Sequence, residues 1–167
     1  SSQAIPTQKS SYTIYVDWQK PSKCVEAISD ALKPHYSWRL LQEGRDRAKY
    51  RVPSTEVKGA IQSIKNLVPV KIYENHVKVS QQFVYNASRY VAIDTLAQYY
   101  YQAIQDSEKA SVISELSDAL DQLELERNQV MRDYLTLRLH TQTSAFHIEC
   151  KPFAPPVEGE ARVAVPW

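Results

Sequence analysis

Aromatic and basic side chains recur at alternate positions of several short segments in the first half of the chain. Tyr15 and Tyr73 are rings on which nucleic-acid bases could stack, and cations beside them could bind phosphates. The cations at matching positions are Arg39, Lys49, Arg51 and Lys71, and a turn between two segments adds Arg45 and Arg47. The pattern predicts binding of RNA or DNA, with an affinity that falls steeply as salt rises.

These side chains can act together only if the segments form one sheet. Alternating β-formers predict strands at 12–17, 37–43, 48–52 and 70–79, the last of which could instead be a short hairpin. Apolar residues at helical spacing, bounded by prolines, predict helices at 22–33 and 54–68. The order is therefore β-α-β-β-α-β, as in ferredoxin-like domains, where both helices cover one face of an antiparallel sheet.

Alternation along the strands divides their side chains between two faces. The face expected to pack beneath the helices holds Ile14, Val16, Trp38, Leu40, Ala48, Tyr50, Val52, Val70 and Ile72. The other face carries the tyrosines and cations described above. It would bind nucleic acid if it is open, or it could be covered by later helices whose acids pair with its cations.

The segment Ile14–Val16 resembles the aromatic-bearing first strand of RNA-recognition domains, which use this face of this topology to bind RNA. The third strand, 47–52, departs from the pattern of that family, since it lacks the glycine and the paired aromatics. The resemblance covers only a few residues, so the chain is not assigned to the family.

Two stripes of apolar residues follow at alternating spacings of three and four. The first contains Tyr90, Ile93, Ala97, Tyr100 and Ile104; the second runs from Ile113 to Leu137 as a heptad seam interrupted by Arg127. The phase break near Ser107 predicts an antiparallel helical hairpin over 86–140, with a single bent helix as the alternative. The seam packs against the first stripe, or it joins a second chain as a homo-oligomer. Arg127 is expected to reach Glu124 or solvent.

Several residues outside the sheet are candidates for contacts with other proteins. Tyr99 and Tyr101 belong to a run of three tyrosines that points in three directions around a helix, so at least one ring should be exposed. Phe153 and Trp167 lie in a proline-rich C-terminal segment that cannot build a core of its own. Residues 1–85 carry a charge of +6 and residues 86–167 carry −5, which indicates different partners for the two halves.

Composition excludes several kinds of chemistry. The only glycines are Gly44, Gly59 and Gly159, so a P-loop, a dinucleotide-binding turn and a serine nucleophile elbow are all absent. The four histidines have no metal-ligand spacing, and the His147–Glu149 pair lacks the cysteines of zinc deaminases. Cys24 and Cys150 make no disulfide framework, and Cys24 is expected to be a small buried residue. We therefore expect no enzyme activity, no metal and no cofactor.

The expected fold is α+β, with an N-terminal arm at 1–11, a ferredoxin-like module at 12–85, the hairpin at 86–140, and a short strand and proline-rich tail at 141–167. The expected function is a non-catalytic subunit of a multi-protein assembly, a nucleoprotein complex in which the basic sheet face contacts RNA or DNA. The alternative is a scaffold or regulatory protein that oligomerises through the 113–137 seam and binds no nucleic acid. A polar N-terminus and the lack of any long apolar run predict a cytoplasmic protein without membrane contact.

Overall fold

The computed structural model describes residues 7–41 and 46–154, and of residues 38–41 it describes the backbone alone. It confirms the mixed α+β class. The elements, in chain order, are β1 (Gln8–Val16), α1 (Pro21–Leu32), β2 (Trp38–Leu41), β3 (Arg47–Pro53), the 3-10 turn η1 (Ser54–Glu56), α2 (Val57–Leu67), β4 (Val70–Lys78), α3 (Ser80–Asp106), α4 (Ala110–Gln142) and β5 (Thr143–Cys150).

The sheet has five strands in the order β2-β3-β5-β1-β4. Strand β5 runs parallel to β1 and antiparallel to β3, and β2 is antiparallel to β3. Backbone hydrogen bonds from Asp17 to Pro69 and from Val79 to Thr7 join opposite ends of β1 and β4, so these two strands are antiparallel.

The position of β5 corrects the expected organisation. Residues 145–150 were expected to form a short strand beside a proline-rich tail, outside the module at 12–85. Instead β5 lies in the middle of the sheet and separates β1 from β3. The five-stranded order therefore differs from a ferredoxin-like sheet built from the first four strands alone. A strand that follows the two long helices completes the core of the N-terminal module.

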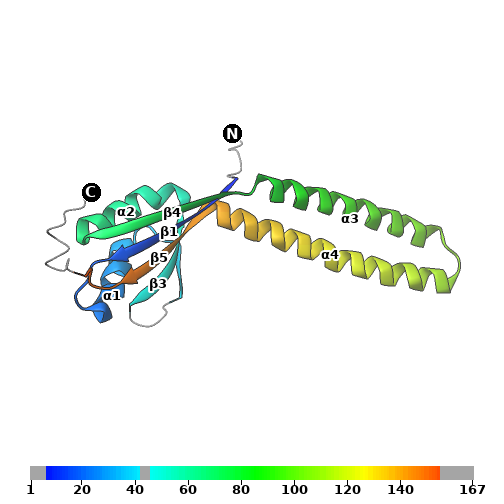
Figure 1. Ribbon diagram of the computed structural model, residues 1–167. Helices are drawn as coiled ribbons and strands as arrows, with labels where there is room; N and C mark the ends of the chain where they lie inside the picture. Colours follow the sequence, from blue (N-terminus) through cyan, green and yellow to red (C-terminus); the bar gives the residue numbers. More distant parts are fainter. Residues whose placement is uncertain (1–6, 42–45, 155–167) are drawn as a thin grey trace. The chain divides into compact units, whose positions relative to one another are not determined.

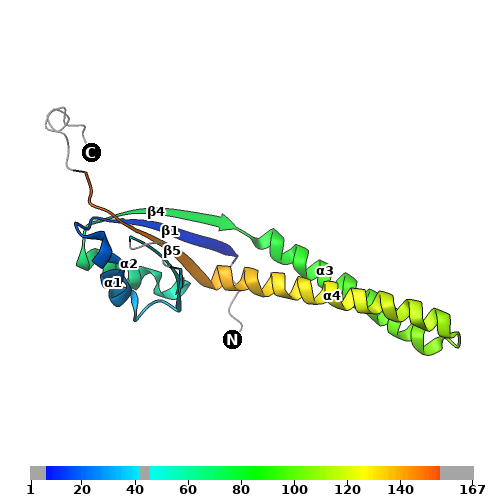
Figure 2. The same cartoon turned by 90° about the horizontal axis from the view of Figure 1, so that it is seen from below.

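Helices α1 and α2 cover one face of this sheet (Figure 2). The described inward-facing side chains are those expected from alternation: Ile14, Val16, Ala48, Tyr50 and Val52 are buried, and Val70 and Ile72 pack against them. Strand β5 adds Phe146 and Ile148, and α1 contributes Val25, Ile28 and Leu32. Burial of this apolar surface is the main force that holds the layers together.

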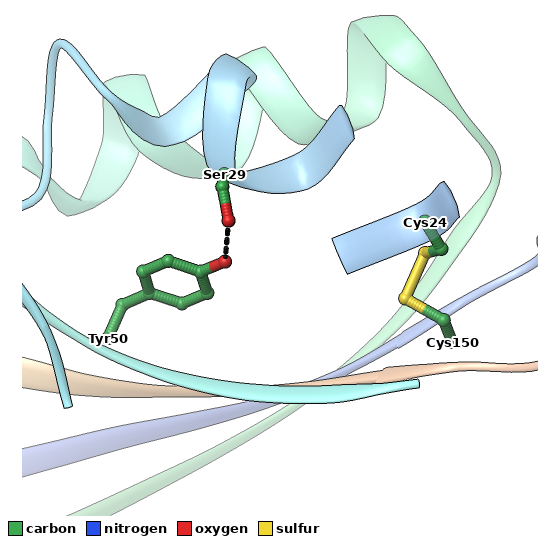
Figure 3. Close-up of a disulfide and its surroundings, with 4 residues drawn as sticks. All are labelled: Cys24, Ser29, Tyr50 and Cys150. Carbon is green, nitrogen blue, oxygen red and sulfur yellow. Dashed lines mark hydrogen bonds between the residues drawn. A yellow bond between two sulfur atoms is a disulfide. The ribbon is translucent and has the colours of Figure 1, made fainter. Parts of the chain in front are cut away.

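A disulfide joins the two cysteines (Figure 3), contrary to the expectation that they make no cross-link. Cys24 lies in the first turn of α1 and Cys150 ends β5, with 6.1 Å between their Cα atoms. The sequence conceals this pairing because 126 positions separate the two residues. They become neighbours only because β5 enters the sheet beneath α1. The expectation that Cys24 is buried is confirmed.

Helices α3 and α4 run side by side as a hairpin (Figure 1), joined by residues 107–109. Their shared core contains Ile93 and Ala97 from α3 with Leu120, Leu123 and Val130 from α4. The heptad seam thus packs within the chain. Helix α3 begins six residues before the expected start at 86.

The chain divides into two units. Of the described residues, 76–142 and 7–9 form one unit, and 10–41, 46–75 and 143–154 form the other. The boundaries thus fall within β4 and at the junction of α4 with β5, rather than at the expected positions 85 and 140. Among the described residues, none of the helices has the length and apolar character required to cross a bilayer.

Candidate functional site

Within the sheet unit, no described helix lies on the face opposite α1 and α2 (Figure 2). Tyr15 on β1 and Tyr73 on β4 meet there edge to face, with 5.7 Å between ring centroids. The Lys151 ammonium lies 5.6 Å from the centre of the Tyr15 ring, and Tyr73 is 61% exposed. The two tyrosines expected to stack on bases are therefore brought together beside a cation.

Arg47 is paired within the protein. Its Nε lies 3.1 Å from Oε1 of Glu149, the residue directly opposite it on β5. Next to this pair, Lys49 and His147 complete a depression of about 160 Å³. The Glu149 carboxylate reduces the positive charge available to an incoming phosphate at this point.

Arg51 is the predicted phosphate ligand whose position fits worst with that role. Its side chain is 9% exposed, and it donates hydrogen bonds to Oγ1 and to the backbone oxygen of Thr143, at 3.0 and 3.3 Å. Burial lowers the pKa of its guanidinium. These contacts fasten β3 to the start of β5, so Arg51 is a structural cation.

Lys71 and Phe153 were expected in separate roles, but they contact each other. The Lys71 ammonium lies 4.6 Å from the centre of the Phe153 ring, and the Phe153 N–H donates to Oδ1 of Asp17 at 2.8 Å. The ring and the backbone amide of Phe153 thus both make contacts within the sheet unit. The side chain of Arg39, together with Arg45 and Trp167, lies outside the described residues.

Sequence reasoning missed a chain of three polar side chains at the end of α1. His35 Nδ1 lies 2.9 Å from Oε2 of Glu56, and His35 Nε2 lies 3.1 Å from the Ser63 hydroxyl. Gly59 leaves room for the ring, since a Cβ there would lie 3.2 Å from His35 Cε1. No spacing signal could reveal this set, because the partners are 21 and 28 positions apart.

These three residues have the order of a nucleophile, a base and an orienting carboxylate. The Ser63 hydroxyl, however, donates to the backbone oxygen of Gly59 at 3.1 Å. Ser63 also lies inside α2, where the helix occupies the backbone N–H groups that would have to stabilise an oxyanion. The arrangement therefore fits a link between α1 and α2 better than a hydrolytic site.

The two tyrosines proposed for partner contacts lie on the hairpin. Tyr99 is 67% exposed and its ring tilts against Tyr100. Tyr101 donates its hydroxyl to the Glu124 carboxylate, and this hydrogen bond raises the pKa of the phenol above its ordinary value. Tyr99 is thus the more accessible of the two.

Arg127 reaches across the hairpin rather than along α4. Its Nη1 lies 3.0 Å from Oδ1 of Asp94, whereas Glu124, the expected partner, binds Tyr101. Both groups are partly exposed, so the pair contributes at most about 1 kcal/mol to stability.

An apolar groove of about 300 Å³ lies between the two helices, toward the β4 and β5 ends of the hairpin. Its lining includes Ala87 and Val91 from α3 and Met131 from α4. The apolar stripe extends from the groove to Val84 on α3 and Leu135 on α4. We call these five residues the groove face. Four of them are large apolar side chains that are 39–66% exposed.

In the described ranges, the structure contains no cluster of three or more His, Cys, Asp and Glu side chains able to bind a metal ion. No protein-family model matches the chain, and no curated protein or solved structure matches it significantly.

Proposed function

We propose that this chain is a non-catalytic docking subunit of a protein assembly, and that its helical hairpin is the docking element. The observation that carries the proposal is the groove face, where Val84, Val91 and Leu135 are more than half exposed beside an apolar groove. Single exposed apolar residues are common on proteins. An apolar groove flanked by exposed apolar side chains of two packed helices is instead typical of a surface that binds another protein.

The disulfide supports an oxidising compartment as the place of this assembly, in place of the cytoplasm expected from the sequence. Disulfides persist outside the reducing cytosol and are rare within it. The two cysteines are buried against the sheet core, with 0% and 2% exposure, so reductants would reach them only when the unit opens.

A photocrosslinking amino acid at position 91 tests the docking role in cells that make the protein. We expect discrete crosslinked products from Val91, and none from Lys58, an exposed position on α2 in the other unit. Absence of any product from position 91, or equal products from both positions, would refute the docking role.

Binding of nucleic acid is a second candidate, supported by one arrangement in particular. Tyr15 and Tyr73 meet on the face that α1 and α2 leave uncovered, with Lys151 against one ring. Aromatic platforms beside cations bind single strands through stacking and phosphate contacts. Arg51 is buried and Arg47 is paired with Glu149. This candidate therefore assigns the phosphate contacts to Lys71 and Lys151, with Lys49 as a further cation of the same face.

Fluorescence anisotropy with short single-stranded RNA and DNA tests this candidate. We expect the combined change Lys49→Glu and Lys71→Glu to abolish binding. The control, Lys58→Glu with Lys65→Glu, makes the same charge change on α2 and should bind as the parent does. Equal losses in the two variants would indicate attraction by net charge alone and would reject the sheet site. Arg51 must stay unchanged, because its loss would disturb the sheet.

A further inference from the structure

Charge is distributed unevenly along the hairpin. The half that contains the turn, residues 94–126, has eight acidic residues and one basic residue, a charge of −7. The other half, 80–93 with 127–142, has four basic residues and one acidic residue, a charge of +3. The groove face lies in this basic half. Its natural complement is therefore a helical surface that carries negative charge.

The acidic half of a second hairpin has this chemistry. When two hairpins lie antiparallel, the −7 half of each faces the +3 half of the other. When they lie parallel, the two −7 halves face each other and repel. Charge complementarity of this kind selects the orientation of helical pairs more strongly than it sets their affinity.

The Asp94–Arg127 ion pair marks the centre of this arrangement. Asp94 is near the middle of α3 and Arg127 near the middle of α4. A two-fold axis that relates two antiparallel hairpins would pass close to this pair. Each Arg127 could then reach the Asp94 of either copy, so the charged interruption of the seam also serves the contact between copies.

The available area is sufficient for a stable dimer. At a rise of about 1.5 Å per residue, α3 is roughly 40 Å long, and two helices side by side are about 20 Å wide. One face of the hairpin therefore offers about 800 Å². A standard interface buries about that area on each partner.

We propose that the partner docked on the groove face is a second copy of this chain, held in antiparallel orientation as a four-helix contact between two hairpins. This inference rests on the proposed docking role and names its partner. The predicted seam at 113–137 is then the internal core of each hairpin, and the groove face of each copy lies against the acidic half of the other.

Sedimentation velocity on the full chain at about 50 µM gives the first test. We expect a dimer, and a monomer for the combined change Val91→Glu and Met131→Glu, which places two acids in the groove face. The control, Gln122→Glu with Leu125→Glu, adds the same charges at two exposed positions of α4 outside the groove face and should remain dimeric. A monomeric parent, or a dimer that survives the groove variant, would overturn the proposal.

Introduced cysteines give the second test, which does not depend on how the acidic variant folds. The native cysteines are paired, so one cysteine at position 84 or at position 102 is the only reactive thiol. These two positions lie nine residues on either side of Ile93 on the same side of α3. In an antiparallel dimer, mild oxidation should crosslink a mixture of Val84→Cys and Gln102→Cys, and neither variant alone. Crosslinking of each variant with itself would show parallel pairing and contradict the proposal.

The two proposals fail separately. If position 91 crosslinks in cells to a different protein while the purified chain is monomeric, the docking role stands and self-association is rejected. If position 91 crosslinks to a second copy, both stand. If it gives no product and the chain is monomeric, both fail.

Discussion

Arg51 is the residue whose structural role differs most from its predicted role. Its buried guanidinium satisfies two acceptors on Thr143, so we expect Arg51→Ala to lower the free energy of unfolding by about 1–3 kcal/mol. Lys58→Ala, at an exposed position on α2, should cost less than about 0.5 kcal/mol. Urea unfolding monitored by tyrosine fluorescence measures both. Equal, small effects would show that Arg51 does not secure the sheet.

Tyr12 predicts how the sheet unit responds to alkaline pH. Burial, and then the Glu74 charge, raise the pKa of its phenol above the ordinary value of 10.0. Folding therefore favours the neutral phenol. The stability that this adds to the folded state is complete below about pH 10 and is lost as the pH rises through the folded-state pKa. We expect the melting temperature to fall less steeply above pH 10 in Tyr12→Phe than in the parent. If the melting temperatures of the two proteins fall equally with pH, ionisation of Tyr12 does not destabilise the sheet unit.

Local pattern predicts which way side chains face, but not what they meet. Alternation correctly assigned Ile14, Val16 and Tyr50 to the covered face, because the two-residue period of a strand is a property of the local chain. The partner of Arg51 is 92 positions away, and that of Cys24 is 126 away. Both depend on where β5 enters the sheet, which no local pattern records.

Arg127 allows a test of the hairpin as an element. It occupies a seam position between Leu123 and Val130, where an apolar side chain would pack against α3. Because a partly exposed ion pair contributes little, Arg127→Leu should raise the stability of the hairpin by about 0.5–1.5 kcal/mol. Asp94→Ala should change it by less than about 0.5 kcal/mol. Urea unfolding at about 1 µM, followed by circular dichroism at 222 nm, measures both changes in the monomer. Destabilisation by Arg127→Leu would mean that the ion pair dominates.

The helices were predictable because their signal is also local. Spacings of three and four residues predicted both apolar stripes. The break in their phase predicted the turn, which the structure places at 107–109. The groove face could not be obtained in this way. A helical stripe indicates the buried side of each helix, whereas a groove depends on how Val91 and Met131 come together across two helices.

At the scale of the whole chain, the order of elements makes the sheet unit discontinuous in sequence. Its first four strands end at residue 78, and its central strand begins at 143, after both long helices. The sheet unit can therefore be completed only after β5 returns to pair with β1 and β3. Docking of β5 is the long-range step on which the remaining contacts depend.

The disulfide should matter most at this step, because it fastens the end of β5 to α1. In the chain-entropy model, closing a loop of 126 positions stabilises the folded state by about 5 kcal/mol. Unfolded chains in general retain some local structure, which lowers this figure, so we expect reduction of the disulfide to cost about 2–5 kcal/mol. Urea unfolding with and without a phosphine reductant measures the loss. The variant with Cys24→Ser and Cys150→Ser should have the stability of the reduced protein, and the reductant should not change it. Identical unfolding of the parent in both conditions would show that the two thiols are not joined.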